Sequence, residues 1–332
     1  MRGLATPPLV QQVFAALADG LFCSGTELAQ RAGVTRSAVW KAIEQLRGCG
    51  AIVHAVTGRG YRLATPTSAL DAARIHSLLA GWEDCVTLDV AWSPHSTNEA
   101  LLAQDPPPAD CYHVLLAEQQ LAGRGRRGRP WFAPLGGAIC MSIAASFMAV
   151  PRDASALSLA MGVCVLRALR PVCDAGLKLK WPNDIVAPSG KLGGILIELR
   201  AESRGPAHLV VGVGVNVRLD AAIDVLVRQT GTIAADLAGL GVDPLARNEI
   251  AARLIVECLA GIRAFSTSGF SPFAAEWRAA DALRDKCVSV SGAGVTLTGI
   301  ARGIDACGAL QLATAAGPQS VTAGDVSVRA QP

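Results

Sequence analysis

Hydrophobic positions near the start of the chain repeat with the period of amphipathic helices. One face is formed by residues at i, i+3, i+4 and i+7, namely Val10, Val13, Phe14 and Leu17, and Gly20 ends this segment. Ser24 is a predicted N-cap, with Glu27 as its capping-box partner, for a short helix over residues 25–32. After Thr35 a further helix carries a second apolar face, formed by Val39, Ala42, Ile43 and Leu46. Two helices joined by a tight turn that contains glycine indicate a helix-turn-helix.

The pattern changes from helical to strand-like over residues 51–63. This segment has β-preferring residues on both sides of a turn at residues 57–60, which predicts a hairpin. A hairpin after a helix-turn-helix is typical of a winged helix, whose last helix enters the major groove of DNA. The DNA-binding residues predicted on that helix and at the wing tip are Thr35, Arg36, Ser37, Trp40, Lys41 and Arg59. A winged helix that docks on protein and never binds DNA remains the alternative.

Beyond a linker rich in Pro, Thr and Ser at residues 63–71, strand-like and helix-like segments alternate. The predicted strands are residues 86–90, 114–118, 138–146, 177–180, 194–199 and 209–217. The predicted helices are residues 98–103, 154–170, 247–264 and 272–280. Several strands follow one another without a helix between them, which favours an α/β domain of mixed α+β type with a mainly antiparallel sheet. Near the C-terminus, short strands are predicted at residues 287–291, 295–300 and 309–313.

Composition and charge restrict the class of protein. The 332 residues, 51% hydrophobic and 17% charged, suit a globular protein of two or three domains. No apolar run reaches the roughly 18 residues of a membrane span, and no secretory signal is visible. The first 63 residues carry seven basic and three acidic side chains, a net charge of +4, which leaves −1 for the rest of the chain's +3. This asymmetry favours a polyanion partner at the N-terminal end, although a solvated basic surface would give the same count.

The ten cysteines are irregularly spaced and form no C-x-x-C pair. In a chain of this length, that pattern favours a reduced cytoplasmic protein with mostly buried thiols and argues against a zinc site.

Residues 123–129, GRGRRGR, place four arginines and three glycines directly after a predicted strand. Glycines let the backbone wrap closely around a ligand, and arginines form charge-assisted hydrogen bonds with phosphate and carboxylate groups. The peptide lacks the Gly-Lys-Ser/Thr of a Walker A loop, and it leads into Pro130-Trp131 rather than a helix, so the dinucleotide fingerprint is excluded. By itself the peptide is also compatible with a basic nucleic-acid patch.

Two further peptides carry candidate chemistry. Residues 180–184, KWPND, are followed by Lys191 just before a Gly-Gly pair. The Lys191 ammonium could neutralise charge that develops on a phosphate oxygen, and Asp184 could hold magnesium or a ribose hydroxyl. Residues 212–217, GVGVNV, leave gaps on one strand face that could admit a flat ligand, with Asn216 as a polar anchor. An ordinary turn with solvated charges and a close-packed core strand are the respective alternatives.

Taken together, these peptides resemble those of the biotin protein ligase family. The match runs in order through residues 96–98, 118–129, 180–184, 191–198 and 212–216, and continues at residues 299–310. The winged helix in front makes the chain similar to the bifunctional members, which combine a biotin ligase with a biotin operon repressor. The resemblance implies three domains: a winged helix-turn-helix over residues 1–64, a biotin- and ATP-binding catalytic domain over residues 70–282, and a small SH3-like β-barrel over residues 283–332.

The resemblance also implies an activity. Biotin, ATP and Mg2+ give biotinyl-5'-AMP, and biotin then passes to a lysine of the biotin carboxyl carrier protein of acetyl-CoA carboxylase. With biotinyl-5'-AMP as co-repressor, a homodimer would repress biotin synthesis genes at operator DNA. A protein-derived covalent nucleophile is not required, and the five histidines form no evident triad.

The resemblance assigns roles residue by residue. The implied catalytic residues are Arg124, Arg126, Asp184 and Lys191, with Asp184 also as a magnesium ligand through ATP. The implied biotin-binding residues are Ser96, Thr97, Asn98, Gln120, Gly123, Arg124, Gly125, Arg126, Lys191, Gly194 and Gly212. The implied nucleotide-binding residues are Arg126, Arg127, Trp131, Lys180, Asn183, Asp184, Gly214 and Asn216.

One departure from the family pattern lies at residues 229–233, QTGTI, where some relatives place a Trp over the adenine. The absence of an aromatic residue there predicts looser adenine binding and faster release of the adenylate. Three other functions remain open: a ligase whose winged helix no longer regulates, a lipoate or octanoate ligase, and a ligand-sensing repressor without catalysis.

Overall fold

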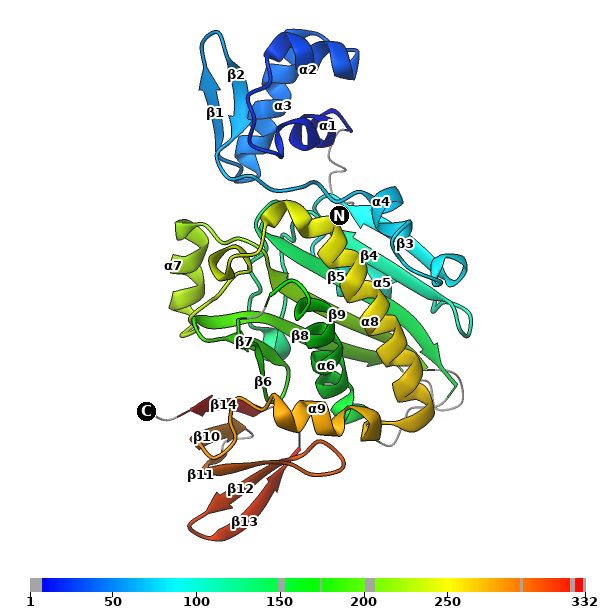
Figure 1. Cartoon of the computed structure of the whole chain (residues 1–332), viewed down its shortest axis with the longest axis vertical. Helices are drawn as coiled ribbons and strands as arrows, with labels where there is room; N and C mark the ends of the chain where they lie inside the picture. Colours follow the sequence, from blue (N-terminus) through cyan, green and yellow to red (C-terminus); the bar gives the residue numbers. More distant parts are fainter. Residues whose placement is uncertain are drawn as a thin grey trace.

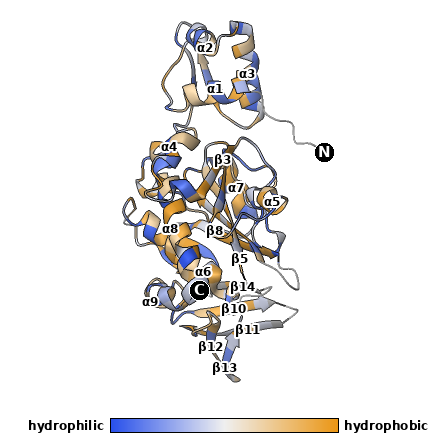
Figure 2. Ribbon diagram, turned by 90° about the vertical axis from the view of Figure 1, so that its right-hand side faces the viewer, coloured by the Kyte–Doolittle hydropathy of each residue, from blue (hydrophilic) through white to orange (hydrophobic). Residues whose placement is uncertain are grey.

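The computed structural model describes residues 8–148, 153–173, 175–200, 207–292, 295–322 and 326–330. Three modules follow one another along the long axis of the molecule, as two perpendicular views show (Figures 1 and 2). The N-terminal helical module lies at one end, a seven-stranded sheet with its helices forms the middle, and a five-stranded sheet lies at the other end.

The N-terminal module is the predicted winged helix. Its elements are α1 (Pro8–Leu17), α2 (Gly25–Ala32), α3 (Arg36–Gly48), β1 (Val53–Val56) and β2 (Gly60–Leu63). The Ser24 hydroxyl accepts a hydrogen bond from the Glu27 N–H at 3.0 Å, and Thr35 caps α3 in the same way through Ala38 at 3.3 Å. The predicted apolar faces of α1 and α3 are buried in one core, so the helical periodicity is confirmed.

The central sheet has the strand order β3-β4-β5-β9-β8-β7-β6 and is antiparallel except for the β3–β4 pair. Its strands are β3 (Val86–Ala91), β4 (Tyr112–Ala117), β5 (Ala138–Phe147), β6 (Lys178–Lys180), β7 (Asp184–Ala187), β8 (Gly190–Arg200) and β9 (Ala207–Asn216). The helices around it are α4 (Ala72–His76), α5 (Thr97–Leu102), α6 (Leu157–Leu169), α7 (Ala221–Gln229), α8 (Arg247–Ser268) and α9 (Ala274–Ala279). The mixed, mainly antiparallel architecture is confirmed; β7, α4 and α7 were not anticipated.

Strand β5 shows how the sheet separates a core from a site. Ile139, Met141 and Ile143 alternate onto the face covered by α6 and α8, where they join the main hydrophobic core. Cys140 and Ser142 point to the opposite face, towards α5, and are also buried. Because one face is filled by large apolar side chains, only the other face can hold a ligand.

The C-terminal module is an antiparallel sheet with the order β13-β12-β11-β10-β14. Its strands are β10 (Cys287–Gly292), β11 (Val295–Ile304), β12 (Leu310–Thr314), β13 (Gly317–Val321) and β14 (Val326–Ala330). The three predicted strands are present; β13 and β14 were not anticipated. Buried Trp181 of the central module donates its indole N–H to the Gly308 carbonyl at 3.0 Å, which fastens this sheet to the central module.

The linker between the first two modules is held in place by specific contacts. Phe14 of α1 packs edge-on against Trp92, with ring centroids 5.4 Å apart, and the Thr67 hydroxyl donates to the Gly136 carbonyl at 2.9 Å. Arg247, fully buried at the start of α8, pairs with Glu118 and donates to the Ser68 carbonyl. The winged helix is therefore seated on the body through buried contacts.

All ten cysteines are free thiols; five are buried, and Cys307 is exposed. Within the ranges that the structure describes, no helix combines the length and the apolar character needed to cross a bilayer.

Candidate functional site

A cavity of about 530 Å³ lies on the sheet face opposite α6 and α8. Nearly all the ligand-binding residues predicted from the sequence line it, although they come from segments up to 120 positions apart. They are Ser96, Thr97, Asn98, Gln120, Arg124, Gly125, Arg126, Arg127, Trp131, Lys180, Asn183, Asp184, Lys191, Gly194, Gly212, Gly214 and Asn216. The structure thus brings the predicted peptides into one site.

One end of the cavity has a neutral polar floor. The N-terminus of α5 places Thr97 and Asn98 over β5, where both side chains contact the Ser142 hydroxyl at 2.7 and 2.6 Å. Gln120, just after β4, accepts a hydrogen bond from the Thr97 backbone N–H at 2.8 Å. A set of uncharged donors and acceptors that is fixed by mutual hydrogen bonds suits a neutral polar ligand group.

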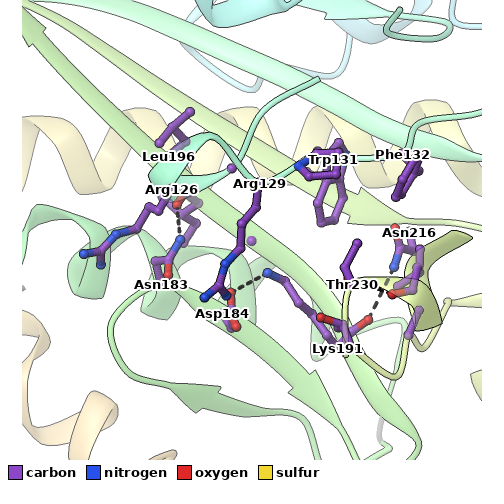
Figure 3. Close-up of a pocket in the computed structure, with 18 of the residues that line it drawn as sticks. Arg126, Arg129, Trp131, Phe132, Asn183, Asp184, Lys191, Leu196, Asn216 and Thr230 are labelled. Atoms are coloured by element: carbon purple, nitrogen blue, oxygen red, sulfur yellow. Dashed lines mark hydrogen bonds and ion pairs between the residues drawn. The ribbon is translucent and has the colours of Figure 1, made fainter. Parts of the chain in front are cut away.

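The other end of the cavity is charged (Figure 3). The Lys191 Nζ lies 2.6 Å from the Asp184 Oδ1 and 5.8 Å from the centroid of the Trp131 ring. Figure 3 shows the Arg129 side chain directed towards this pair, whereas the Arg126 side chain extends away from Lys191. Cationic groups that converge beside a half-buried carboxylate can neutralise a phosphate.

The glycine-arginine loop crosses the cavity in a compact turn. Gly125 donates its N–H to the Arg129 carbonyl at 2.8 Å, and Trp131 donates to the Gly123 carbonyl at 2.8 Å. Arg127 has φ 60°, a left-handed conformation that costs a non-glycine residue energy and is typical of functional loops. Arg124 reaches outwards to Glu99, with a nitrogen-to-oxygen distance of 3.6 Å.

Gly123 is the one predicted biotin residue that does not line the cavity. A Cβ there would stand 2.6 Å from the Trp131 carbonyl oxygen and 2.9 Å from the Gln120 amide nitrogen. The glycine therefore permits close approach of the returning loop, and its predicted contact with biotin stays a prediction.

The two glycines of β9 also make room for side chains of the protein. Their missing side chains do leave gaps, but the protein's own side chains occupy much of them. A Cβ on Gly212 would lie 2.3 Å from the Asn98 Oδ1, and a Cβ on Gly214 would lie 2.6 Å from the Trp131 ring. Each glycine therefore seats one wall residue of the cavity, and each still contributes backbone surface to the lining.

The side-chain amides of Asn216 and Asn183 donate hydrogen bonds to backbone carbonyls. The Asn216 Nδ2 donates to the carbonyls of Ala235 and Lys191, at 2.9 and 3.3 Å, and the Asn183 Nδ2 donates to the Ile195 carbonyl at 2.6 Å. These hydrogen bonds therefore stabilise the strands that carry Lys191 and Asp184. Asn216 lines the cavity, and its role as a polar anchor for a ligand stays a prediction.

Several residues of the lining were missed from the sequence. Arg129 belongs to the Arg-rich peptide and Phe132 follows Trp131, so their position in the sequence next to predicted site residues could have indicated them. Thr230 follows α7 and Val328 lies on β14, and no local pattern links these positions to the site. No aromatic side chain comes from residues 229–233, but Trp131 and Phe132 provide aromatic surface elsewhere in the lining.

Cys140 lines the cavity but is not suited to act as a nucleophile. Burial raises the pKa of its thiol to about 11, so it stays protonated at neutral pH.

Asp184 is the one carboxylate in the described lining, and no cluster of three or more metal-binding side chains occurs among the described residues. A site of this kind suits magnesium that arrives with a phosphate ligand, since Mg2+ commonly takes one or two protein carboxylates and substrate phosphates.

The winged helix presents the predicted DNA-binding side chains at its surface. Thr35, Arg36, Ser37, Trp40, Lys41 and Arg59 are all exposed, and Trp40 retains 54% of its accessible surface. Thr35 also caps α3, and the Arg59 guanidinium stacks 4.2 Å above the Phe22 ring centroid.

Comparison with known proteins fits this arrangement. Residues 90–216 match the Biotin/lipoate A/B protein ligase family, residues 11–62 match an HTH domain, and residues 288–329 match the Biotin protein ligase C terminal domain. The Bifunctional ligase/repressor BirA of Salmonella typhimurium is 36% identical over 94% of this chain and 95% of its own length. The Escherichia coli protein of the same name is 35% identical over 98% of both chains.

A solved structure is similar as well. The biotin protein ligase from Aquifex aeolicus in complex with biotin and ATP superimposes with a TM-score of 0.61 at 25% identity, covering 74% of this chain and 99% of the other. From its three matched domains and its near full-length relatives, the chain belongs to the biotin protein ligase family, with the winged helix of the bifunctional ligase/repressors.

Proposed function

We propose that this chain forms biotinyl-5'-AMP from biotin and ATP and transfers biotin to a lysine of the biotin carboxyl carrier protein. The observation that carries this proposal is one cavity with two unlike ends. The neutral hydrogen-bonding floor around Thr97, Asn98 and Gln120 suits the cyclic urea of biotin, and the charged end around Lys191 suits the reacting carboxylate and phosphates. The assigned site residues are those of the lining described above.

The chemistry needs charge neutralisation and positioning more than it needs a nucleophile from the protein. A carboxylate oxygen of biotin attacks the α-phosphorus of ATP, the bond to pyrophosphate breaks, and a mixed anhydride forms. Lys191 and the loop arginines would hold the converging negative groups in line. Mg2+ supplies further charge neutralisation when it is bound, and Asp184 would hold it together with the phosphates. The amine of the acceptor lysine then attacks the acyl carbon and AMP leaves.

The transfer step can be tested with the full chain. The protein is mixed with biotin, MgATP and the biotinyl domain of a carrier protein, and the acceptor is analysed by intact mass and peptide mapping. We expect the mass of one biotin to be added at one lysine. An unmodified acceptor would contradict the proposal, and modification only when lipoate replaces biotin would favour the lipoate ligase alternative.

We propose further that the winged helix binds operator DNA as a homodimer when the adenylate is bound, and so represses biotin synthesis genes. The exposed basic residues on α3 support DNA binding, and the buried contacts that seat the winged helix on the body offer a path for coupling. A gel shift that does not respond to biotin plus ATP would contradict regulation by the adenylate. In that case the winged helix would be non-regulatory.

Neutralising Arg36 or Lys41 should weaken DNA binding across sequences. Each contributes a phosphate contact in the proposed docking, so R36A or K41A is expected to lower the slope of log affinity against log salt by about one. Fluorescence anisotropy at several salt concentrations measures this slope. The R302A variant, on the distant C-terminal sheet, is the control and should keep the wild-type slope. An unchanged slope in R36A and K41A would contradict the docking.

Gly214→Ala should impair the catalytic cavity. The new methyl group would stand 2.6 Å from the Trp131 ring, so the indole must move into the ligand space. Misplacement of a wall residue by about 1 Å can cost up to 100-fold, and we expect kcat/KM for biotin to fall by about 10- to 100-fold. Biotin-dependent pyrophosphate release measures it. Gly48→Ala, where a Cβ meets nothing within 4 Å, is the matched control. Equal activity of both variants would contradict the role of Gly214.

The three domains are proposed with the boundaries 1–64, 70–282 and 283–332. We also propose that the protein works in the cytoplasm, where its nucleotide, carrier protein and DNA are found. Ten free thiols are compatible with a reducing compartment.

A further inference from the structure

The Asn98 side chain is held by groups that accept hydrogen bonds and cannot donate them. Its Nδ2 donates to the Glu198 Oε2 at 2.8 Å and to the Leu196 carbonyl at 3.3 Å. An ionised carboxylate has no proton to give, and neither does a carbonyl. A flipped Asn98 amide would place its oxygen against two acceptors. Glu198 and Leu196 therefore fix which way the amide faces.

The fixed amide determines how Ser142 is used. The Asn98 Oδ1 can only accept, and the Ser142 Oγ lies 2.6 Å from it. A hydroxyl has one proton, and Ser142 donates it to Asn98. Towards the Thr97 hydroxyl, 2.7 Å away, the Ser142 oxygen can therefore only accept. Hydrogen-bond direction is thus transmitted from Glu198, through Asn98 and Ser142, to the Thr97 hydroxyl.

The last members of this chain line the cavity. The Thr97 hydroxyl proton has two acceptors within reach, the Ser142 Oγ at 2.7 Å and the Gln120 Oε1 at 3.2 Å. Because Ser142 donates its own proton to Asn98, the Thr97 proton is directed towards these acceptors, and the Thr97 oxygen keeps a lone pair for the ligand. The Gln120 Oε1 accepts from the Thr97 backbone N–H at 2.8 Å, so its Nε2 is left as a donor. A neighbouring acceptor and donor complement a group with an N–H beside a carbonyl, which is the pattern of a cyclic urea.

Glu198 acts from outside the cavity, which it does not line. It is half-buried on β8, on the same face as Leu196, and its link to the ligand passes through Asn98. The tight seat over Gly212, where a Cβ would stand 2.3 Å from the Asn98 Oδ1, prevents Asn98 from moving to another partner.

We propose that Glu198 is a positioning residue that sets the hydrogen-bond polarity of the cavity floor and thereby its preference for the biotin ring. This inference rests on the proposed biotin ligase function. A neutral residue that still accepts at this place should preserve the polarity, and an apolar residue should lose it.

The first test compares E198L with E198Q in the full-length protein. Titration calorimetry gives the Kd for biotin, and pyrophosphate release gives the KM values for biotin and MgATP. E198L is expected to raise the biotin Kd and KM by about 10- to 100-fold, because the Asn98 donor loses its partner, with the MgATP KM nearly unchanged. E198Q should stay within about threefold of wild type, because its amide oxygen can still accept. E257L, a half-buried glutamate on α8 at the other face of the sheet, is the control.

The second test reverses the partners and does not depend on an apolar replacement. N98D places a carboxylate against Glu198 and should weaken biotin binding by more than about tenfold, because two acceptors then face each other. The double variant N98D/E198Q supplies a donor from the new amide on β8 and should recover part of that loss. Equal biotin affinity in E198L and wild type, or a double variant no better than N98D, would overturn the inference. A wild-type protein that binds no biotin would overturn the proposed function, and this inference with it.

Discussion

Replacing Lys191 by methionine is expected to lower kcat/KM for biotin adenylation by about 100- to 1000-fold. The Lys191 Nζ is the cation 2.6 Å from Asp184, and it lies beside Trp131 inside the cavity. Methionine keeps much of the shape and removes the charge, so the negative charge of the reacting groups loses a fixed partner. Asp184 is also left without its ion pair and repels the phosphates. Initial rates of pyrophosphate release at varied biotin concentration measure the effect.

Two further variants separate the causes of this loss. K191M/D184N removes the unpaired carboxylate together with the lysine. It should bring the KM for biotin back towards the wild-type value, and the rate should stay low because the proposed magnesium ligand is lost as well. Lys286→Met, an exposed lysine before β10, should behave as wild type. If K191M keeps more than about a tenth of the wild-type kcat/KM, Lys191 is not an electrostatic centre of the site.

Arg247→Met is expected to lower the free energy of unfolding by about 3–5 kcal/mol, since breaking a buried ion pair leaves an uncompensated charge. Arg247 is fully buried and donates to the Ala138 carbonyl at 2.8 Å and to the Ser68 carbonyl at 3.2 Å, as well as pairing with Glu118. Glu118 in turn accepts from the Leu70 N–H at 2.5 Å. Loss of the Arg247 side chain would therefore destabilise the linker at Ser68, the residues that follow β4, and the start of β5 together.

Chemical denaturation followed by circular dichroism measures this loss. Arg253→Met, exposed on the same helix, should change stability by no more than about 0.5 kcal/mol. The double variant R247M/E118M should recover part of the loss, because an apolar pair leaves no buried charge behind. An R247M protein as stable as R253M would show that the buried pair does not hold the linker.

The sequence predicted those features that depend on local pattern. Apolar spacing in α1 and α3 and the caps at Ser24 and Thr35 reproduce the winged helix, because one helix face must be buried and its first N–H groups need acceptors. Helix α7 was not predicted. None of its residues is buried, so the helix has no buried apolar face to reveal it in the sequence. Strand β7 was not predicted, because its four residues are too few to show a clear alternation of apolar and polar positions.

The site was predicted as a set of residues, but its internal roles depend on pairings that only the fold creates. Gly212 and Gly214 were expected to leave space for a ligand; they line the cavity and also seat Asn98 and Trp131 from distant segments. Asn216 was expected to anchor a ligand; it lines the cavity and also secures the backbone of Lys191, which the sequence did not predict. No periodicity in the sequence links Arg247 to Glu118, since 129 positions separate them.

The most direct measurement is to identify what the wild-type protein makes when no acceptor is present. The protein is incubated with MgATP and equal concentrations of biotin and lipoate, and the small molecules bound to the protein and those released into solution are analysed by mass spectrometry. The cavity predicts biotinyl-5'-AMP as the adenylate in the two fractions together, with one pyrophosphate released for each adenylate formed. Lipoyl-AMP as the main product, or no adenylate and no pyrophosphate, would contradict it.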